Sequence, residues 1–195
     1  MKSTPILFTG EMVRAILDGR KTQTRRLVKP QPRNRIVKSS DDGQWYDADC
    51  VNPGVFVKCP YGQPGDRLWV KETFCADDNN DFCFRADEWV ECPAENGKWK
   101  PSIFCTRKAS RITLEIVSVR VERLSGISED DAISEGITWP EQNGKPYRPP
   151  IDLTGISSLR VAANRYSELW ESINGKGSWA KNPWVWVLEF KRITT

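Results

Sequence analysis

The sequence contains no histidine among its 195 residues. Histidine is the general base of Ser-His-Asp and Cys-His catalysis and a ligand in zinc hydrolases, so its absence excludes these mechanisms. Any catalysis must therefore use carboxylates, lysine, cysteine, tyrosine or a hydroxyl group, and most of the common hydrolase classes are removed.

Metal-binding cysteine pairs and long apolar runs are lacking as well. No Cys-x-x-Cys pair occurs, so the spacing typical of structural zinc is absent, and we expect no metal and no other cofactor. No run approaches the roughly 18 apolar residues of a membrane helix, and the first residues carry no signal-peptide pattern. We therefore expect a cytoplasmic protein without membrane contact. Its six cysteines are expected to be free thiols: Cys50, Cys59, Cys75, Cys83, Cys92 and Cys105.

The composition is that of a globular protein, with 38% hydrophobic and 28% charged residues. Nine tryptophans supply large buried areas, so a compact core is possible. The net charge is only +3, but basic residues crowd into the first forty positions. Such a local basic field can steer phosphates and favours an anionic partner. The cluster consists of Arg14, Arg20, Lys21, Arg25, Arg26, Lys29, Arg33, Arg35 and Lys38.

Periodicity and capping signals predict a mixed α+β chain. A one-residue slip in the alternation after Ile116 indicates a β-bulge or bend, which suits a small closed barrel. We expect one domain over residues 1–195, a small β-barrel flanked by helices. The expected strands cover residues 6–8, 67–74, 111–123 and 184–190, and the expected helices, two of them capped by Thr9 and Ser128, cover 11–18, 129–135 and 158–173. Pro- and Gly-rich insertions, read as loops with one hairpin in the second, cover about 31–64, 75–108 and 138–155.

The most distinctive segment is Gly19-Arg20-Lys21-Thr22-Gln23-Thr24-Arg25-Arg26, directly after the first helix. In a regular strand Lys21 and Thr24 would face opposite sides, whereas in a turn they converge. A solvent-exposed basic strand is the alternative interpretation.

This segment resembles the signature of the ASCH family, which has a PUA-like fold. The signature reads Gly, any residue, Lys, two residues, Glu, any residue, Arg. Gly19, Lys21 and Arg26 match it, whereas Thr24 stands at the glutamate position. Lysine and threonine at this spacing are similar to the branch that hydrolyses N4-acetylcytidine. The whole chain also resembles ASCH-domain proteins of bacterial prophages.

In that branch a glutamate near the end of a short helix completes the site. Glu135 falls at the matching place within 128–137. The alternative for Glu135 is a helix-end carboxylate in solvent. Segments 65–70, 112–121 and 184–190 are also similar to strands of the family.

The resemblance implies a metal-independent amidohydrolase acting on N4-acylated cytidine or a similar modified nucleoside. Thr24 would act as nucleophile, and Lys21 as its base or as oxyanion stabiliser. Glu135 would orient the lysine or shuttle a proton. Arg20, Arg26, Trp69 and Glu72 are the candidate substrate-binding residues. Further candidates for base stacking or phosphate contact are Trp139, Trp179, Arg107, Lys108 and Arg111.

Two other function classes remain open. The first is a non-catalytic module that binds RNA or a modified base in the same cleft, as the basic first third and the aromatic content suggest. The second is a nuclease, which the lack of histidine and of an acidic metal cluster disfavours.

Overall fold

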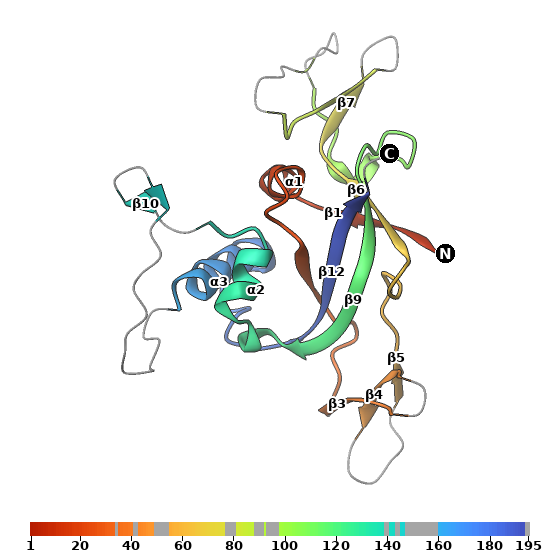
Figure 1. The fold of residues 1–195 in the computed structure, drawn as a ribbon, viewed down its shortest axis with the longest axis vertical. Coiled ribbons are helices and arrows are strands. Elements are labelled where there is room, and N and C mark those ends of the chain that lie inside the picture. Colours follow the sequence, from red (N-terminus) through yellow and green to blue (C-terminus); the bar gives the residue numbers. More distant parts are fainter. Residues whose placement is uncertain are drawn as a thin grey trace. The chain divides into compact units, whose positions relative to one another are not determined.

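The computed structural model describes residues 1–33, 35–40, 43–48, 55–76, 81–87, 92, 98–138, 141–142, 145–146 and 160–193 (Figure 1). The chain divides into two compact units. The first comprises Met1–Thr22, Pro60–Val119 and Glu189–Thr195, and the second comprises Gln23–Cys59 and Arg120–Leu188. The single domain over residues 1–195 stays a prediction.

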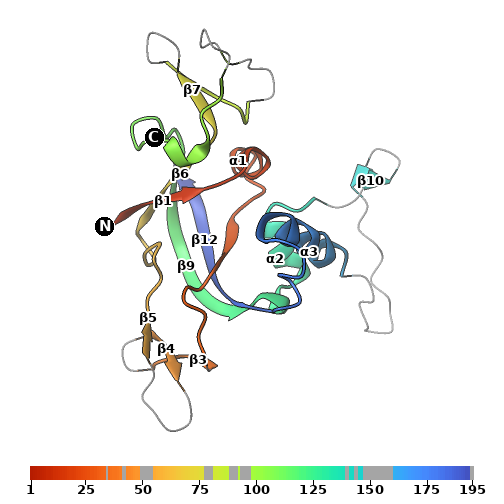
Figure 2. The same ribbon diagram turned by 180° about the vertical axis from the view of Figure 1, so that it is seen from behind.

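Two long strands, β9 (Thr113–Arg123) and β12 (Trp184–Ile193), contribute to both units. In the first unit the strand order is β1-β6-β9-β12, and in the second it is β9-β12-β2. Strand β12 lies between two neighbours in the strand order, and its residues 185–188 are buried on both faces, as its continuous apolar run predicts. Figure 2 shows β12 running beside β9.

The first unit is built on strand β6 (Arg67–Lys71), which pairs in parallel with β1 (Ser3–Leu7) and antiparallel with β9. Helix α1 (Gly10–Leu17) follows β1, and the Thr9 hydroxyl accepts the Met12 N–H at 3.4 Å, as the capping signal predicts. Alternate strand residues and one helix face form the core, which includes Ile6, Val13, Ile16, Leu68, Val70, Leu114 and Ile116.

The strand expected over 67–74 is interrupted after Lys71. Glu72 is buried there, and a separate hairpin follows, formed by β7 (Phe74–Ala76) and β8 (Phe82–Phe84). The hairpin predicted within 75–108 is therefore confirmed. With the 3₁₀ turn η1 (Ser102–Phe104) nearby, it encloses a small cluster of Phe74, Phe84, Cys105 and Ala109.

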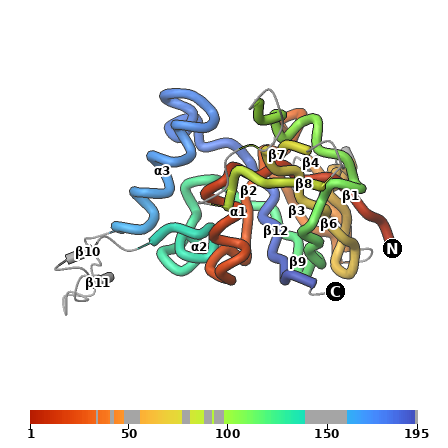
Figure 3. Tube along the Cα trace, turned by 90° about the horizontal axis from the view of Figure 1, so that it is seen from above, coloured from red at the N-terminus to blue at the C-terminus, as the bar shows by residue number. Residues whose placement is uncertain are grey.

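The second unit contains β2 (Gln23–Leu27), the 3₁₀ turn η2 (Leu124–Gly126), α2 (Glu129–Ser134) and α3 (Val161–Asn174). Helix α2 carries the predicted Ser128 cap, completed by Asp131 as a capping box. The Glu129 carboxylate accepts the N–H groups of Ala162 and Ala163 at 2.9 and 3.1 Å, so α2 caps the start of α3. The two helices lie side by side (Figure 3). Their shared core includes Leu124, Ile127, Ala132, Tyr166, Trp170, Val185 and Val187.

The interpretation of residues 31–64 as an irregular loop is wrong. They form a three-stranded antiparallel sheet of β3 (Arg35–Lys38), β4 (Trp45–Ala48) and β5 (Val55–Val57). Short strands in a polar sequence leave too little alternation to be recognised. Within the third insertion the described residues are the paired strands β10 (Glu141–Gln142) and β11 (Lys145–Pro146).

The expected α+β class is confirmed. Strands β1 and β2 stand at the two ends of the strand order, and the described residues show no pairing that closes a barrel. No described helix is long and apolar enough to cross a membrane. The prediction of free thiols holds for Cys59, Cys75, Cys83, Cys92 and Cys105, whereas Cys50 and Trp139 lie outside the described residues.

Candidate functional site

Four residues of the basic segment after α1 are buried, so the interpretation as a solvent-exposed strand is wrong, although Arg20 and Thr22 are exposed. Lys21, Gln23 and Thr24 are each 2% exposed, and Arg25 is 3% exposed. Residues 23–27 form strand β2 beside β12. Buried polar and charged groups are costly unless they are paired, so each one requires a partner or a function.

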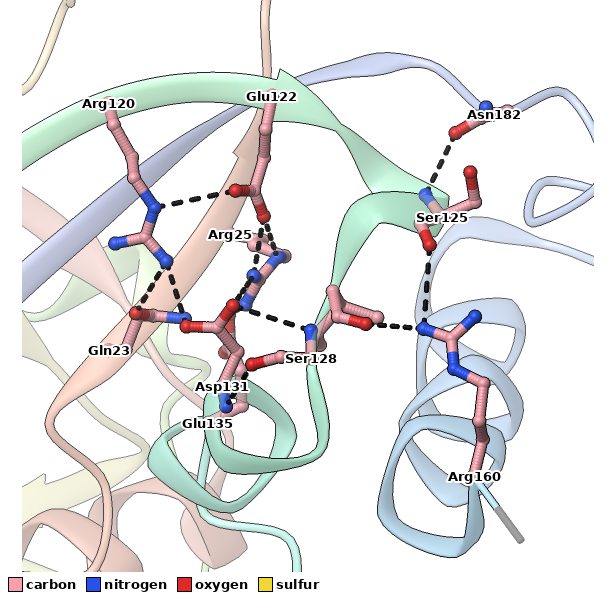
Figure 4. Close-up of polar contacts among 11 residues, drawn as sticks. Gln23, Arg25, Arg120, Glu122, Ser125, Ser128, Asp131, Glu135, Arg160 and Asn182 are labelled. Carbon is pink, nitrogen blue, oxygen red and sulfur yellow. Dashed lines mark hydrogen bonds and ion pairs between the residues drawn. The ribbon is translucent and has the colours of Figure 1, made fainter. Parts of the chain in front are cut away.

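Arg25 is the centre of an ion network in the second unit (Figure 4). Its side chain is fully buried and contacts three carboxylates. Nε and Nη2 donate to Glu122 Oε1 at 3.1 and 2.5 Å, and Nη1 donates to Glu135 Oε1 at 3.2 Å. Nη2 also lies 3.2 Å from Asp131 Oδ2. The guanidinium thereby joins β2, β9 and α2.

Arg120 extends the same network along β9. Its Nη2 donates to Gln23 Oε1 at 3.1 Å and to Asp131 Oδ1 at 2.8 Å, and its Nε donates to Glu122 Oε2 at 3.4 Å (Figure 4). Asp131 and Glu122 therefore each bridge two arginines. Burial by itself raises the pKa of Asp131, but Arg25, the Gln23 hydrogen bond and Arg120 outweigh it and hold that pKa below its ordinary value.

Glu135 caps the C-terminal end of α2 and is 3% exposed, so it is not a helix-end carboxylate in solvent. Besides Arg25 it lies near the Tyr166 phenol. Burial, and next the negative charge of Glu135, raise the pKa of Tyr166 well above its ordinary value. The Arg25 guanidinium lies 5.8 Å from the centroid of the Tyr166 ring. Glu135 is therefore held in place by a cation beside an un-ionised phenol.

Thr24 lies in β2 between Gln23 and Arg25. Since side chains alternate along a strand, Gln23 and Arg25 share the face that contacts β9 and α2, and Thr24 belongs to the other face. Its hydroxyl is nevertheless buried, at 2% exposure.

Lys21 belongs to the first unit, at the end of α1, and its N–H donates to the carbonyl of Ala15 at 2.9 Å. The Nζ atom lies 5.8 Å from the centroid of the Phe8 ring, which itself packs against Phe190 at 6.1 Å. The structure thus places Lys21 in the first unit, and Thr24 and Glu135 in the second. Their joint action stays a prediction.

Glu72, a candidate substrate-binding residue, is held by Arg111 in the first unit. Arg111 Nε and Nη2 donate to Glu72 Oε1 and Oε2, each at 3.0 Å, and Arg111 also contacts both oxygens of Asp87 at 2.9 and 2.8 Å. The guanidinium stacks on the Phe84 ring at 4.1 Å. Burial raises the pKa of Glu72 even though Arg111 opposes the shift. Arg111 is thereby placed in an internal ion pair.

The other predicted residues lie apart from one another. Arg20 is exposed and pairs with Asp18 at 2.8 Å, and Arg26 is half-buried in β2. Trp69 lies on the face of β6 opposite Leu68 and Val70, and is not brought together with Lys21. Trp179 packs on Tyr166 at 6.2 Å, so its place is in the core of the second unit.

The sequence interpretation missed Arg25, Arg120 and Glu122 as network residues. The signal available was a pair of charged residues two positions apart, Arg120 and Glu122, on a strand whose flanks are apolar. Spacing alone could not identify their partners. Within the described residues, no group of three or more His, Cys, Asp or Glu side chains is arranged to hold a metal ion.

Comparison with protein-family models found no match, and comparison with curated proteins also found none. Among solved structures, the chain is similar to the crystal structure of an ASCH domain from Lactobacillus crispatus. The identity is 16% and the TM-score 0.38, and the alignment covers 98% of this chain and 79% of that one.

Proposed function

We propose that this protein is an ASCH-type amidohydrolase with a PUA-like fold. It removes the acyl group from N4-acylated cytidine or a similar modified nucleoside, without a metal. The observation that carries this proposal is the burial of Lys21, Thr24 and Glu135, which are only 2%, 2% and 3% exposed. Folding seldom buries such groups without a partner or a function, and these three positions resemble those of the family branch that hydrolyses N4-acetylcytidine.

The proposed chemistry needs a nucleophile, a base and an acid for the leaving amine. The Thr24 oxygen attacks the acyl carbon, and its proton passes to Lys21 acting as base. Collapse of the tetrahedral intermediate breaks the C–N bond, and the proton goes to the departing exocyclic nitrogen. Water then hydrolyses the threonine ester. In the second assignment Lys21 stays charged and stabilises the oxyanion, and Glu135 accepts the Thr24 proton and passes it to the leaving nitrogen.

Glu135 is the orienting carboxylate in this scheme. The Arg25 contact at 3.2 Å fixes its position at the end of α2. Preorganised charge of this kind avoids reorganisation during the reaction, which is the main advantage of a buried catalytic site.

The test is incubation of the purified protein with N4-acetylcytidine, following release of cytidine and acetate. Lys21→Ala, Thr24→Ala and Glu135→Gln should each lower turnover by at least about 100-fold, the usual contribution of an acid–base group. Lys181→Ala, a change at an exposed lysine, serves as the matched control and should retain wild-type turnover. Circular dichroism confirms that each variant is folded.

No release of cytidine by folded wild-type protein would overturn the hydrolase proposal. It would favour the alternative, a non-catalytic module that binds RNA or a modified base. Cleavage of a labelled RNA would instead indicate a nuclease. The cytoplasmic location, the relation to prophage proteins and the closed barrel stay predictions from the sequence.

A further inference from the structure

Strand β6 has one face toward the core of the first unit and one face outward. Leu68 and Val70 are fully buried, whereas Arg67 is exposed and Trp69 and Lys71 are half-buried. We call the outward side the Trp69 face. It consists of Arg67, Trp69 and Lys71 of β6, Pro5 and Leu7 of β1, and Thr113 of β9.

The two residues paired with Trp69 across the sheet, Pro5 and Thr113, have small side chains. The strand register places Pro5 on one side and Thr113 on the other. Directly paired residues on one sheet face lie about 5 Å apart, so the indole is flanked by two short side chains that do not extend over it. An aromatic ring in such a position offers a flat surface to a planar ligand.

Cations lie near this ring. Lys71 Nζ lies over one side of the Trp69 ring, 5.7 Å from its centroid, and donates to the carbonyl of Ile103 at 2.5 Å, which fixes its position. Arg107 is exposed, and its Nη2 donates to Thr113 Oγ1 at 3.3 Å. Arg67 stands two residues before Trp69 on the same face.

The nearby acidic residue does not cancel this charge. Glu115 is in register with Arg67 but forms an ion pair with Lys191 at 3.1 Å. Exposed apolar side chains adjoin the cations, since Leu7 is in register with Lys71 and is 45% exposed. Ile103 and Phe104, next to the Lys71 contact, are 62% and 66% exposed.

We propose that the Trp69 face binds single-stranded nucleic acid. A base stacks on the side of the Trp69 indole that Lys71 does not cover, and Arg67, Lys71 and Arg107 contact phosphates. Stacking surfaces edged by cations are the general means by which proteins hold single strands without reading their sequence. Charge complementarity selects this occupant, because the cations at the ring would oppose the burial that an apolar protein partner requires.

The Trp69 face is separate from Lys21 within the first unit. Ile6 is in register with Val70, so Ile6 and Phe8 belong to the core face of the sheet, and Lys21 packs on Phe8. A single-stranded nucleic acid bound on the Trp69 face therefore does not cover Lys21. Binding here is independent of hydrolysis, and it stands whether or not the proposed reaction is found.

The test uses fluorescence anisotropy of a labelled oligouridine of about 12 nucleotides, within the site sizes known for single-strand binders. Trp69→Ala should weaken binding by about 5- to 100-fold. Trp69→Phe keeps a stacking ring and should recover most of the affinity. Replacing Arg67, Lys71 and Arg107 together by alanine should flatten the slope of log K against log salt by about 2.

The second unit supplies a matched control. Lys38 Nζ lies 5.6 Å from the centroid of Trp45, the same lysine–tryptophan arrangement on another sheet. Trp45→Ala and Lys38→Ala should leave oligouridine affinity unchanged.

Two kinds of result would overturn the proposal. The first concerns oligouridine affinity: either wild type and a folded Trp69→Ala variant bind equally well, or Trp45→Ala weakens binding as much as Trp69→Ala does. The second is self-association in sedimentation that Trp69→Ala abolishes, without any binding of oligouridine, because the face would then be a protein interface. Thermal unfolding of each variant confirms that lost binding is not lost folding.

Discussion

Arg25 and Glu135 form a buried ion pair, with Nη1 and Oε1 3.2 Å apart. They stand 110 positions apart in the sequence. The pair ties the end of α2 to strand β2, and the same guanidinium also contacts Glu122 and Asp131. The carboxylate proposed to act in catalysis is therefore part of the structural core of the second unit.

The first prediction concerns removal of this cation. Arg25→Met removes a fully buried guanidinium that three carboxylates share. Because these carboxylates lose their common cation, the free energy of unfolding should fall by about 3–5 kcal/mol. Urea denaturation measures the change. Arg20→Met is the control, because Arg20 pairs with Asp18 in solvent and should change stability by less than about 0.5 kcal/mol. Similar changes in the free energy of unfolding for Arg25→Met and Arg20→Met would show that the ion network does not stabilise the fold.

A second prediction follows from the lowered pKa of Asp131. A carboxyl whose pKa is lower in the folded state adds stability above its ordinary pKa of 3.8, and this stability is lost as the pH falls through the folded-state pKa. Wild-type protein should therefore lose more stability between about pH 6 and about pH 3 than Asp131→Asn. Asp131→Glu keeps the charge and should retain the wild-type pH dependence in urea titrations. A dependence unchanged by Asp131→Asn would refute this assignment.

The pair of Glu72 and Arg111 predicts a pH dependence of stability opposite in sign to that of Asp131. Burial already raises the pKa of Glu72, and loss of Arg111 removes the cation that opposes this shift. A raised folded-state pKa means that stability is lost as the pH rises through it. The destabilisation by Arg111→Met should therefore be larger at about pH 8 than at about pH 5.

The double variant Glu72→Gln with Arg111→Met tests the cause of that effect. It has no titrating carboxyl at position 72, so its loss of stability relative to wild type should vary less between the two pH values. If the double variant shows the same pH dependence as Arg111→Met, another group is responsible.

Gly62 supports the start of β6 through a close approach to Asp66. Its φ is +124°, and an added Cβ would lie 2.8 Å from Asp66 Oδ2. The Asp66 carboxylate accepts the N–H groups of Lys2 and Gln63 at 2.6 and 3.1 Å. Gly62→Ala should thus strain the backbone and displace Asp66, at a cost of about 1–3 kcal/mol in thermal unfolding. Gly126→Ala, where an added Cβ meets nothing within 4 Å, should cost less than about 1 kcal/mol.

Local sequence predicted the local structure well. Thr9 and Ser128 cap their helices because an N-cap uses groups only three residues apart. The apolar run over 184–190 indicates a strand buried on both faces, since a buried strand needs no alternation. The strands of 31–64 were missed because three or four residues carry too little periodicity.

For the candidate site, the sequence by itself limited which chemistry is possible. It lacks histidine, and it carries a lysine, a threonine and a glutamate whose positions resemble those of an amidohydrolase branch. Only the tertiary structure decided that β2 is buried, that Arg25 holds Glu135, and that Trp69 faces outward beside Lys71. The physical reason is distance along the chain. Caps and alternation act between near neighbours, whereas burial and ion pairing depend on which distant segments pack together, and no local pattern records that choice.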